Sequence, residues 1–278
     1  MINSKIFCIA ILATAMSTGC ANSQSAGIDK NSAVSSAAAA TSETITYDLK
    51  NFSKINAGYA YKIHFTQGKD YSVRLEGVPE KVRQYIAVNV KDGTLTLDAT
   101  QKRFKEKEGD VQIDAYVSAP TIENVSISGY CDFIADEISN KGNFKFCCAG
   151  ASTCNISKLS AKQITYKVSG AAQLYMPNIK AGNVDFAVSG AGKIKSNIEA
   201  NTLVMNNSGA VEGTVKFRGD RANLQNSGAC KLDVNVDCKT LKSQCSGATK
   251  LKLSGVAEKV NVENSGVATT NTSELNNL

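Results

Sequence analysis

Apolar and polar residues alternate along most of this chain, and a short step of small residues interrupts the alternation at regular intervals in its second half. The step consists of a small residue, a glycine and usually an alanine, and it occurs eight times, 19 to 21 residues apart. Its glycines are Gly129, Gly150, Gly170, Gly190, Gly209, Gly228, Gly247 and Gly266. A period near 20 without a helical pattern is typical of a solenoid, in which each coil buries its apolar face against neighbouring coils.

The alternation continues with a period of two on both sides of each glycine. Ile164 and Tyr166 stand six and four positions before Gly170, and Leu174 and Met176 stand four and six positions after it. Successive side chains of a strand point to opposite faces, so these apolar residues should share the inner face. Each coil should therefore contain at least two strands.

Residues 44–119 show short alternating strands and turn signals but no repeat. The pair Asp92 and Gly93 predicts the tip of a hairpin, and Pro79 predicts the start of one helical turn. A charged loop is expected at Lys102–Glu108. This part should be an irregular β region.

The small-residue step is best explained as a corner, because glycine permits a backbone bend and small neighbours let corners stack. We predict an all-β fold in which the N-terminal β region leads into a parallel single-stranded β-solenoid, or β-helix, of about eight coils over residues 120–278. Two positions before the glycine, later coils carry Asn207, Asn226, Cys245 and Asn264. Inward amides at this position should form a hydrogen-bonded ladder along the axis. No base accompanies the serines, so the step is not interpreted as a nucleophile.

The N-terminus has the pattern of an export signal. Lys5 precedes the apolar stretch Ile6–Met16, which is too short to span a bilayer as a helix. The four residues ending in Cys20 (Ser-Thr-Gly-Cys) resemble a bacterial lipobox, although Ser17 replaces the usual leucine. We expect residues 1–19 to be a lipoprotein signal peptide and Cys20 to carry the lipid, palmitate included. Plain signal-peptidase cleavage nearby is the alternative.

Residues 20–43 are rich in serine, alanine and asparagine and poor in large apolar groups. Such a segment cannot bury enough surface to offset its ordering entropy, so we expect a flexible tether. The membrane should therefore be a partner through the N-terminal lipid and not through a helix.

The composition limits the kinds of catalytic and metal-binding site that the chain can form. The chain has 278 residues, 42 % of them hydrophobic, and a net charge of +6 with both signs interspersed. A solvated surface is favoured over a nucleic-acid site. The single histidine, His64, excludes most histidine-dependent catalysis and should be exposed on its strand. No cofactor is expected, and Cys147, Cys148 and Cys154 lack both the CxxC spacing and a histidine that a metal site would need.

Seven cysteines follow Cys20: Cys131, Cys147, Cys148, Cys154, Cys230, Cys238 and Cys245. Cys131 with Cys148, and Cys230 with Cys245, stand two positions after one corner glycine and two before the next. Bridges between coils are therefore conceivable in an oxidising envelope. The odd number and the inward positions favour free buried thiols, and the sequence leaves both pairs undecided.

A resemblance to a known family rests on several segments of the N-terminal region. They are Phe52–Ile55 (FSKI), Tyr61–Gly68 (YKIHFTQG), Tyr71–Gly77 (YSVRLEG), Val90–Leu95 (VKDGTL) and the passage Ala119–Gly129. Together with the later Val-Ser-Gly-Ala steps, they resemble the head GIN domain family of bacteria, which is described as a "putative autotransporter adhesin". The resemblance covers the chain from about Ile45 onward. It implies a β-solenoid and an outer-membrane lipoprotein of the cell envelope, on the periplasmic or the surface face, and it implies no catalytic or binding residues.

Three functions are compatible with these features. The first is a non-catalytic adhesin or binding module whose outer faces bind a glycan or an envelope protein. The second is a polysaccharide-active β-helix enzyme, which would need acids clustered across coils. The candidate acids stand at different coil positions and form no column: Asp185, Glu199, Glu212, Asp220, Asp233 and Glu263. The third is a structural protein that forms a homo-oligomer through an open solenoid end. We expect the first, and no enzyme.

Overall fold

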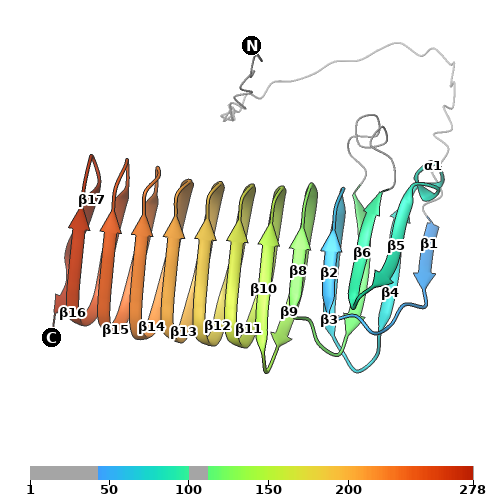
Figure 1. Cartoon of the computed structure of the whole chain (residues 1–278), viewed down its shortest axis with the longest axis horizontal. Helices are drawn as coiled ribbons and strands as arrows, with labels where there is room; N and C mark the ends of the chain where they lie inside the picture. The colour runs from blue at the N-terminus through green and yellow to red at the C-terminus, as the bar shows by residue number, and fades with distance from the viewer. Residues whose placement is uncertain (1–42, 100–111, 278) are drawn as a thin grey trace, which may run out of the picture. The chain divides into compact units, whose positions relative to one another are not determined.

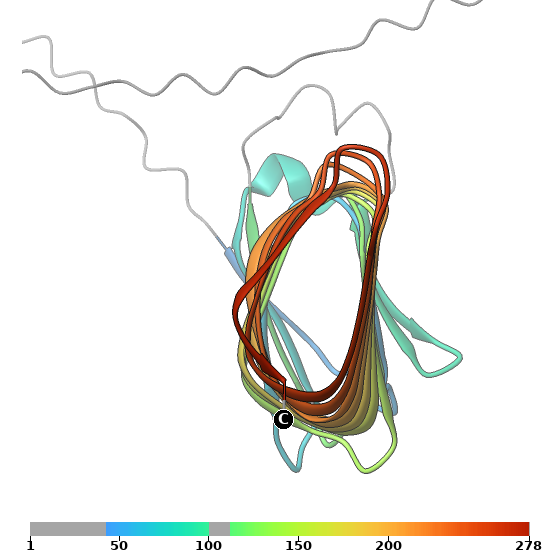
Figure 2. The same cartoon turned by 90° about the vertical axis from the view of Figure 1, so that its left-hand side faces the viewer.

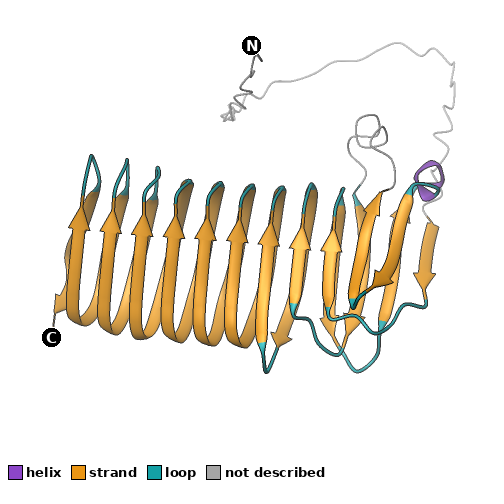
Figure 3. Ribbon diagram, viewed as in Figure 1, coloured by secondary structure: helices purple, strands orange, loops and turns teal. Residues whose placement is uncertain are grey.

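The computed structural model describes residues 43–99 and 112–277. The expected signal peptide, Cys20, most of the tether and the charged loop at 102–108 lie outside the described residues. The described residues form seventeen strands that belong to one continuous sheet, and one short helix. Figure 1 shows the strands side by side along one axis, and Figure 3 shows that loops are confined to the ends of the coils.

The N-terminal region contains seven of these strands and the helix. They are β1 (Glu43–Tyr47), β2 (Lys54–Ala57), β3 (Tyr61–Gln67), β4 (Ser72–Val78), α1 (Glu80–Arg83), β5 (Ile86–Lys91), β6 (Thr94–Ala99) and β7 (Ile113–Ala119). The predicted hairpin is confirmed: β5 and β6 pair antiparallel around Asp92 and Gly93, whose φ angles are 50° and 69°. Positive φ at both turn residues matches the twist of the flanking strands. The helical turn after Pro79 is confirmed as α1.

Several strands of this N-terminal region pair in parallel and stack like the coils of the solenoid. β2 lies parallel between β6 and β8 (Asn124–Ile127), and β3 lies parallel between β7 and β9 (Tyr130–Ser139). The coil formed by β2 and β3 is thus inserted out of chain order. Antiparallel strands β1, β4 and β5 follow on the N-terminal side. Sequence spacing could not reveal these coils, because their partners are not the next segments along the chain.

The remaining strands form the regular solenoid. They are β10 (Asn143–Cys148), β11 (Ala151–Val168), β12 (Ala171–Val188), β13 (Ala191–Asn207), β14 (Ala210–Asn226), β15 (Lys231–Cys245), β16 (Lys250–Asn264) and β17 (Thr269–Asn277). Each of β11 to β16 extends from one corner to the next as a single bent strand and pairs in parallel with its neighbours. The predicted parallel β-solenoid of about eight coils is confirmed. Seen along the axis, the coils superpose on one flattened outline (Figure 2).

The core fills the interior of the coils with the alternating apolar residues. Four positions before the corner, Tyr166 stacks on Phe186 with ring centroids 5.0 Å apart, and Phe146 packs against Tyr166 in a tilted arrangement at 5.8 Å. The same position continues as Met205 and Leu224, which are also buried. Identical positions of successive coils therefore pack in columns along the axis.

The corner glycines are needed because successive corners approach each other closely. A Cβ built on Gly190 would clash with the carbonyl oxygen of Gly170, and the same holds one coil on for Gly209. On either side of the glycine, backbone N–H groups donate to carbonyls one coil earlier, as Ser189 does to Val168 at 2.9 Å. The interpretation of the step as a stacked corner is confirmed.

Candidate functional site: a furrow along the corners

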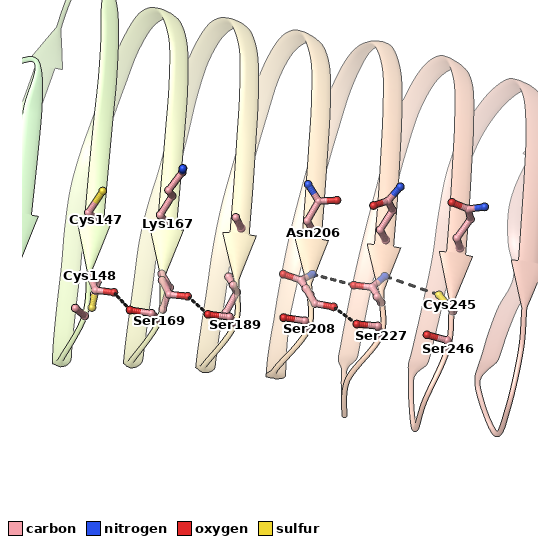
Figure 4. A pocket seen from close by; sticks show the side chains of 18 of the residues that line it. Cys147, Cys148, Lys167, Ser169, Ser189, Asn206, Ser208, Ser227, Cys245 and Ser246 are labelled. Carbon is pink, nitrogen blue, oxygen red and sulfur yellow. Dashed lines mark hydrogen bonds between the residues drawn. The ribbon is translucent and has the colours of Figure 1, made fainter.

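A groove of about 1310 Å³ follows the corners of successive coils. It is lined by the three residues before each corner glycine, from Ser126 to Ser265, and by Asn56 of the inserted coil. We call this groove the corner furrow. Figure 4 shows its two visible rows of side chains, one beginning at Cys147 and the other formed mainly by serines. Its walls come from segments about 20 residues apart in sequence, so only the stacking of coils creates it.

The outer row stands three positions before each glycine and changes character along the axis. It begins with Ser126, Cys147 and Lys167 and ends with Glu263. Its later members include Asn206, Gln225 and Gln244, which we call the amide column. Asn206 and Gln225 are exposed, and the Gln244 amide nitrogen donates to Glu263 Oε2 at 2.8 Å. Hydrogen bonds from Gln244 and Asn261 lower the pKa of the Glu263 carboxyl, which is therefore ionised at neutral pH.

The second row consists of the residue before each glycine, a serine in all but one coil. Ser169, Ser189 and Ser227 donate their hydroxyls to backbone carbonyls of the preceding coil at 3.3 to 3.4 Å. All three serines are exposed and line the furrow, so their hydroxyl oxygens face solvent. They can still accept hydrogen bonds from a ligand.

The floor of the furrow is the buried column two positions before each glycine. Asn207 donates its amide to Asn226 Oδ1 at 2.8 Å, and Asn226 donates to Cys245 Sγ at 3.8 Å. The predicted amide ladder is confirmed for these three residues. Asn264 is instead exposed, and its Oδ1 accepts a hydrogen bond from Thr270. The ladder begins abruptly: Asn207 Oδ1 is buried without a hydrogen-bond partner, next to Val188 of the preceding coil.

The seven described cysteines are all free thiols. Six are buried, and Cys147, which lines the furrow, is partly exposed. Burial raises the pKa of the Cys131 thiol to about 11, and burial also raises the pKa of the Cys154 thiol well above its usual value. Among the described residues, no group of three or more His, Cys, Asp or Glu side chains is arranged to hold a metal ion.

The acidic residues form no cluster suited to catalysis within the part of the chain that the structure describes. Three of the candidate acids pair with basic residues one coil away: Lys180–Glu199 (3.4 Å), Lys231–Glu212 (3.9 Å) and Lys239–Asp220 (2.8 Å). The Asp185 carboxylate accepts a hydrogen bond from the Gln163 amide at 3.2 Å. Such solvent-exposed ion pairs contribute little to stability, because water screens the two charges. Glu263 is the single carboxylate among the furrow residues.

His64 is an outward residue of β3, as the alternation predicts, but its side chain is only 27 % exposed and is therefore partly buried. Its Nε2 lies 2.8 Å from Asp114 Oδ1, and its ring stacks on Tyr116 with centroids 4.6 Å apart. The Arg74 guanidinium lies 4.7 Å from the Tyr116 ring centroid. These side chains come from β3, β4 and β7, and none of them lines the furrow. The neighbouring side chains hold His64 in place.

Comparison with known proteins identifies the family to which the chain belongs. Residues 51–210 and 197–277 match the family described as "Putative auto-transporter adhesin, head GIN domain". The chain belongs to this family. Membership associates it with the cell envelope. No protein with curated functional information matches the sequence.

Solved structures share the fold. A "putative lipid binding protein" from Parabacteroides distasonis has a TM-score of 0.67 and 15 % identity. A "putative adhesin" from the same species has a TM-score of 0.60 and 15 % identity, and one from Bacteroides fragilis has 0.54 and 19 %. Each match covers 83 % of this chain and 96 % of the other. At these identities the likeness concerns the fold alone.

Sequence reasoning identified the corner and the buried amides but missed the furrow and the amide column. Tabulating the residue three positions before each glycine would have shown Asn206, Gln225 and Gln244 in succession. No pattern in the sequence indicated that these residues would line a groove.

In the described residues, no helix is long and apolar enough to cross a bilayer.

Proposed function

We propose that this protein is a non-catalytic adhesin or binding module of the cell envelope that uses the outer surface of its solenoid to bind a glycan or an envelope protein. The observation that carries the proposal is the corner furrow, a continuous groove lined by hydroxyls and amides over successive coils. Long polar grooves on repeat proteins suit extended ligands, because each coil can repeat the same contact.

The chemistry of the furrow supports binding over catalysis. An acid/base mechanism needs two carboxylates, or a carboxylate and a base, around one bond. The furrow residues include one carboxylate, Glu263, and one ammonium, Lys167, which stand five coils apart. The names of the family and its solved relatives refer to adhesion or lipid binding and to no enzyme. An acyl chain inside this solenoid is disfavoured, because buried side chains from every full coil fill the interior.

We propose further that a lipid on Cys20 anchors the protein and that the residues up to 43 act as a tether. The support is the lipobox-like sequence at the end of a short apolar stretch. Labelling cells with a palmitate analogue should mark the wild-type protein. The Cys20→Ala variant should remain unlabelled and leave the membrane fraction. Equal labelling of both would refute the anchor.

The binding function is tested by a glycan array and an envelope-lysate pull-down with the full chain in mild detergent. Retention of a defined glycan or a defined envelope protein is the expected result. If neither probe is retained, the adhesin proposal should be dropped. Release of shortened products from any array glycan would instead favour the enzyme.

A further inference from the structure

The corner furrow is uncharged over its central stretch. On its outer row, Lys167 and Glu263 mark the two ends of this stretch, and Ala187 followed by the amide column lies between them. Buried floor side chains such as Val188 are only 1 % exposed, so they offer no apolar surface to a ligand. A ligand in this stretch would meet neutral polar groups.

The polar groups of this stretch repeat from coil to coil. Asn206 and Gln225 are exposed, and neither has a side-chain hydrogen bond within the described protein. Each amide offers two N–H donors and one acceptor oxygen, with a serine hydroxyl beside it at Ser208 and Ser227. Parallel strands repeat every 4.8 Å or so, so the same donor and acceptor set recurs at that interval.

The buried ladder holds the amide column in register. Directly after Asn206 and Gln225 come Asn207 and Asn226, whose side chains are joined by a 2.8 Å hydrogen bond beneath the furrow. Both buried amides are only 2 % exposed. A backbone fixed on its inner side presents the outer amides at a constant spacing, which lowers the ordering cost of binding.

We propose that the amide column and its neighbouring serines bind an extended, uncharged glycan whose chain runs along the solenoid axis. This inference rests on the proposed binding function and names its site and ligand class. A sugar residue in an extended chain advances by nearly one coil spacing and offers hydroxyls that both donate and accept. The missing charges disfavour acidic glycans and charged peptides, and the covered floor disfavours acyl chains.

The experiment compares matched variants on neutral and acidic probes. The full chain in mild detergent is titrated with neutral hexasaccharides of glucose, mannose, galactose and xylose, and with galacturonate hexamers. The Asn206→Ala/Gln225→Ala variant should bind the retained neutral probe roughly tenfold or more weakly, since each lost hydrogen bond costs a few-fold in affinity. The control Asn183→Ala/Gln173→Ala removes two exposed amides outside the furrow and should leave the affinity unchanged.

A variant that is expected to bind more tightly makes the test independent of any loss of stability. Ala187 precedes Asn206 in the outer row and pairs with it in register. Ala187→Asn should extend the amide column by one coil and tighten neutral hexasaccharide binding by roughly two- to fivefold. An unchanged or weaker affinity would count against the site.

Several outcomes would overturn this inference. They are equal neutral binding by the furrow variant and the wild type, an equal loss in the control, tighter binding of galacturonate, and no binding of any neutral probe. The pull-down separates this failure from failure of the proposed function. An envelope protein or acidic glycan retained by both the wild type and the furrow variant would leave the binding module standing without this site.

Discussion

At the scale of single residues, position within the coil decides what each side chain can do. A serine one place before a corner glycine is exposed at the wall of the furrow, whereas a valine two places before it is buried in the furrow floor. Glycine is required at the corner because a Cβ there would clash with the carbonyl oxygen of the preceding corner. Cys147 is partly exposed only because it occupies the outward row, next to the buried Cys148. Two predictions belong to this scale.

A methyl group at a corner should destabilise the solenoid. In Gly190→Ala the new Cβ would clash with the Gly170 carbonyl, so the backbone must shift, at a cost of about 1–3 kcal/mol. In the control Gly142→Ala, the nearest atom to the new Cβ is Asn140 Oδ1 at 3.5 Å, an ordinary contact. Urea unfolding should show a loss of stability for the first variant and little change for the second. Similar stability of the two variants would contradict the role given to the corner.

Thiol labelling should separate Cys147 from the other described cysteines. The thiolate is the reactive form, and burial raises the pKa of Cys131 and Cys238 to about 11, so both are almost fully protonated at pH 8. With a maleimide and peptide mapping, Cys147 should be the first of the seven to react. Cys147→Ser should abolish the fast phase, and Cys238→Ser should retain it. Equal rates at positions 147 and 238 would show that the coil around Cys238 opens readily.

At the scale of elements, columns of identical positions join neighbouring coils. The aromatic column ends in aliphatic residues, and the valine column becomes amides at Asn207. This second change leaves Asn207 Oδ1 buried and unpaired. An unsatisfied buried acceptor costs about 1–3 kcal/mol, which the rest of the column must offset.

Supplying a donor to Asn207 should reduce that cost. Val188→Thr places a hydroxyl opposite the unpaired oxygen, so the variant should be as stable as the wild type or more stable. Val168→Thr buries the same hydroxyl one coil earlier, opposite Val188, and should lose about 1–3 kcal/mol. Thermal and urea unfolding compare the two. Equal losses would mean that the hydroxyl does not reach the amide.

At the scale of the whole described unit, the solenoid has two different ends. Antiparallel strands β1, β4 and β5 lie at the N-terminal end, whereas β17 is paired on one side by β16 and is almost entirely exposed. Because each coil is held mainly by its neighbours, local stability should decrease toward the less covered end.

Hydrogen exchange can measure this gradient. Backbone amides of β17 should exchange first, those of β16 next, and those of β12 and β13 last, because interior coils are paired on both sides. This order of exchange is expected for the protein without any bound ligand. Uniform protection from β12 to β17 would show that the solenoid opens as one cooperative unit.

The local sequence pattern determined which side chains face inward and how long each coil is. The period of two assigns Tyr166 inward and Lys193 outward, and the spacing of glycines sets the length of each coil, because both depend on neighbours along the chain. The corners, the hairpin at Asp92 and the buried amides at Asn207 and Asn226 followed from the same local rules.

Only the tertiary structure decided what depends on register between distant segments. The insertion of β2 between β6 and β8, and of β3 between β7 and β9, pairs His64 with Ile134, and no repeat in the sequence indicates this pairing. The corner furrow likewise exists only when coils stack, because its rows are built from one residue per coil. The sequence of one coil determines which side chains face outward, and the register between coils determines that Asn206 and Gln225 stand side by side.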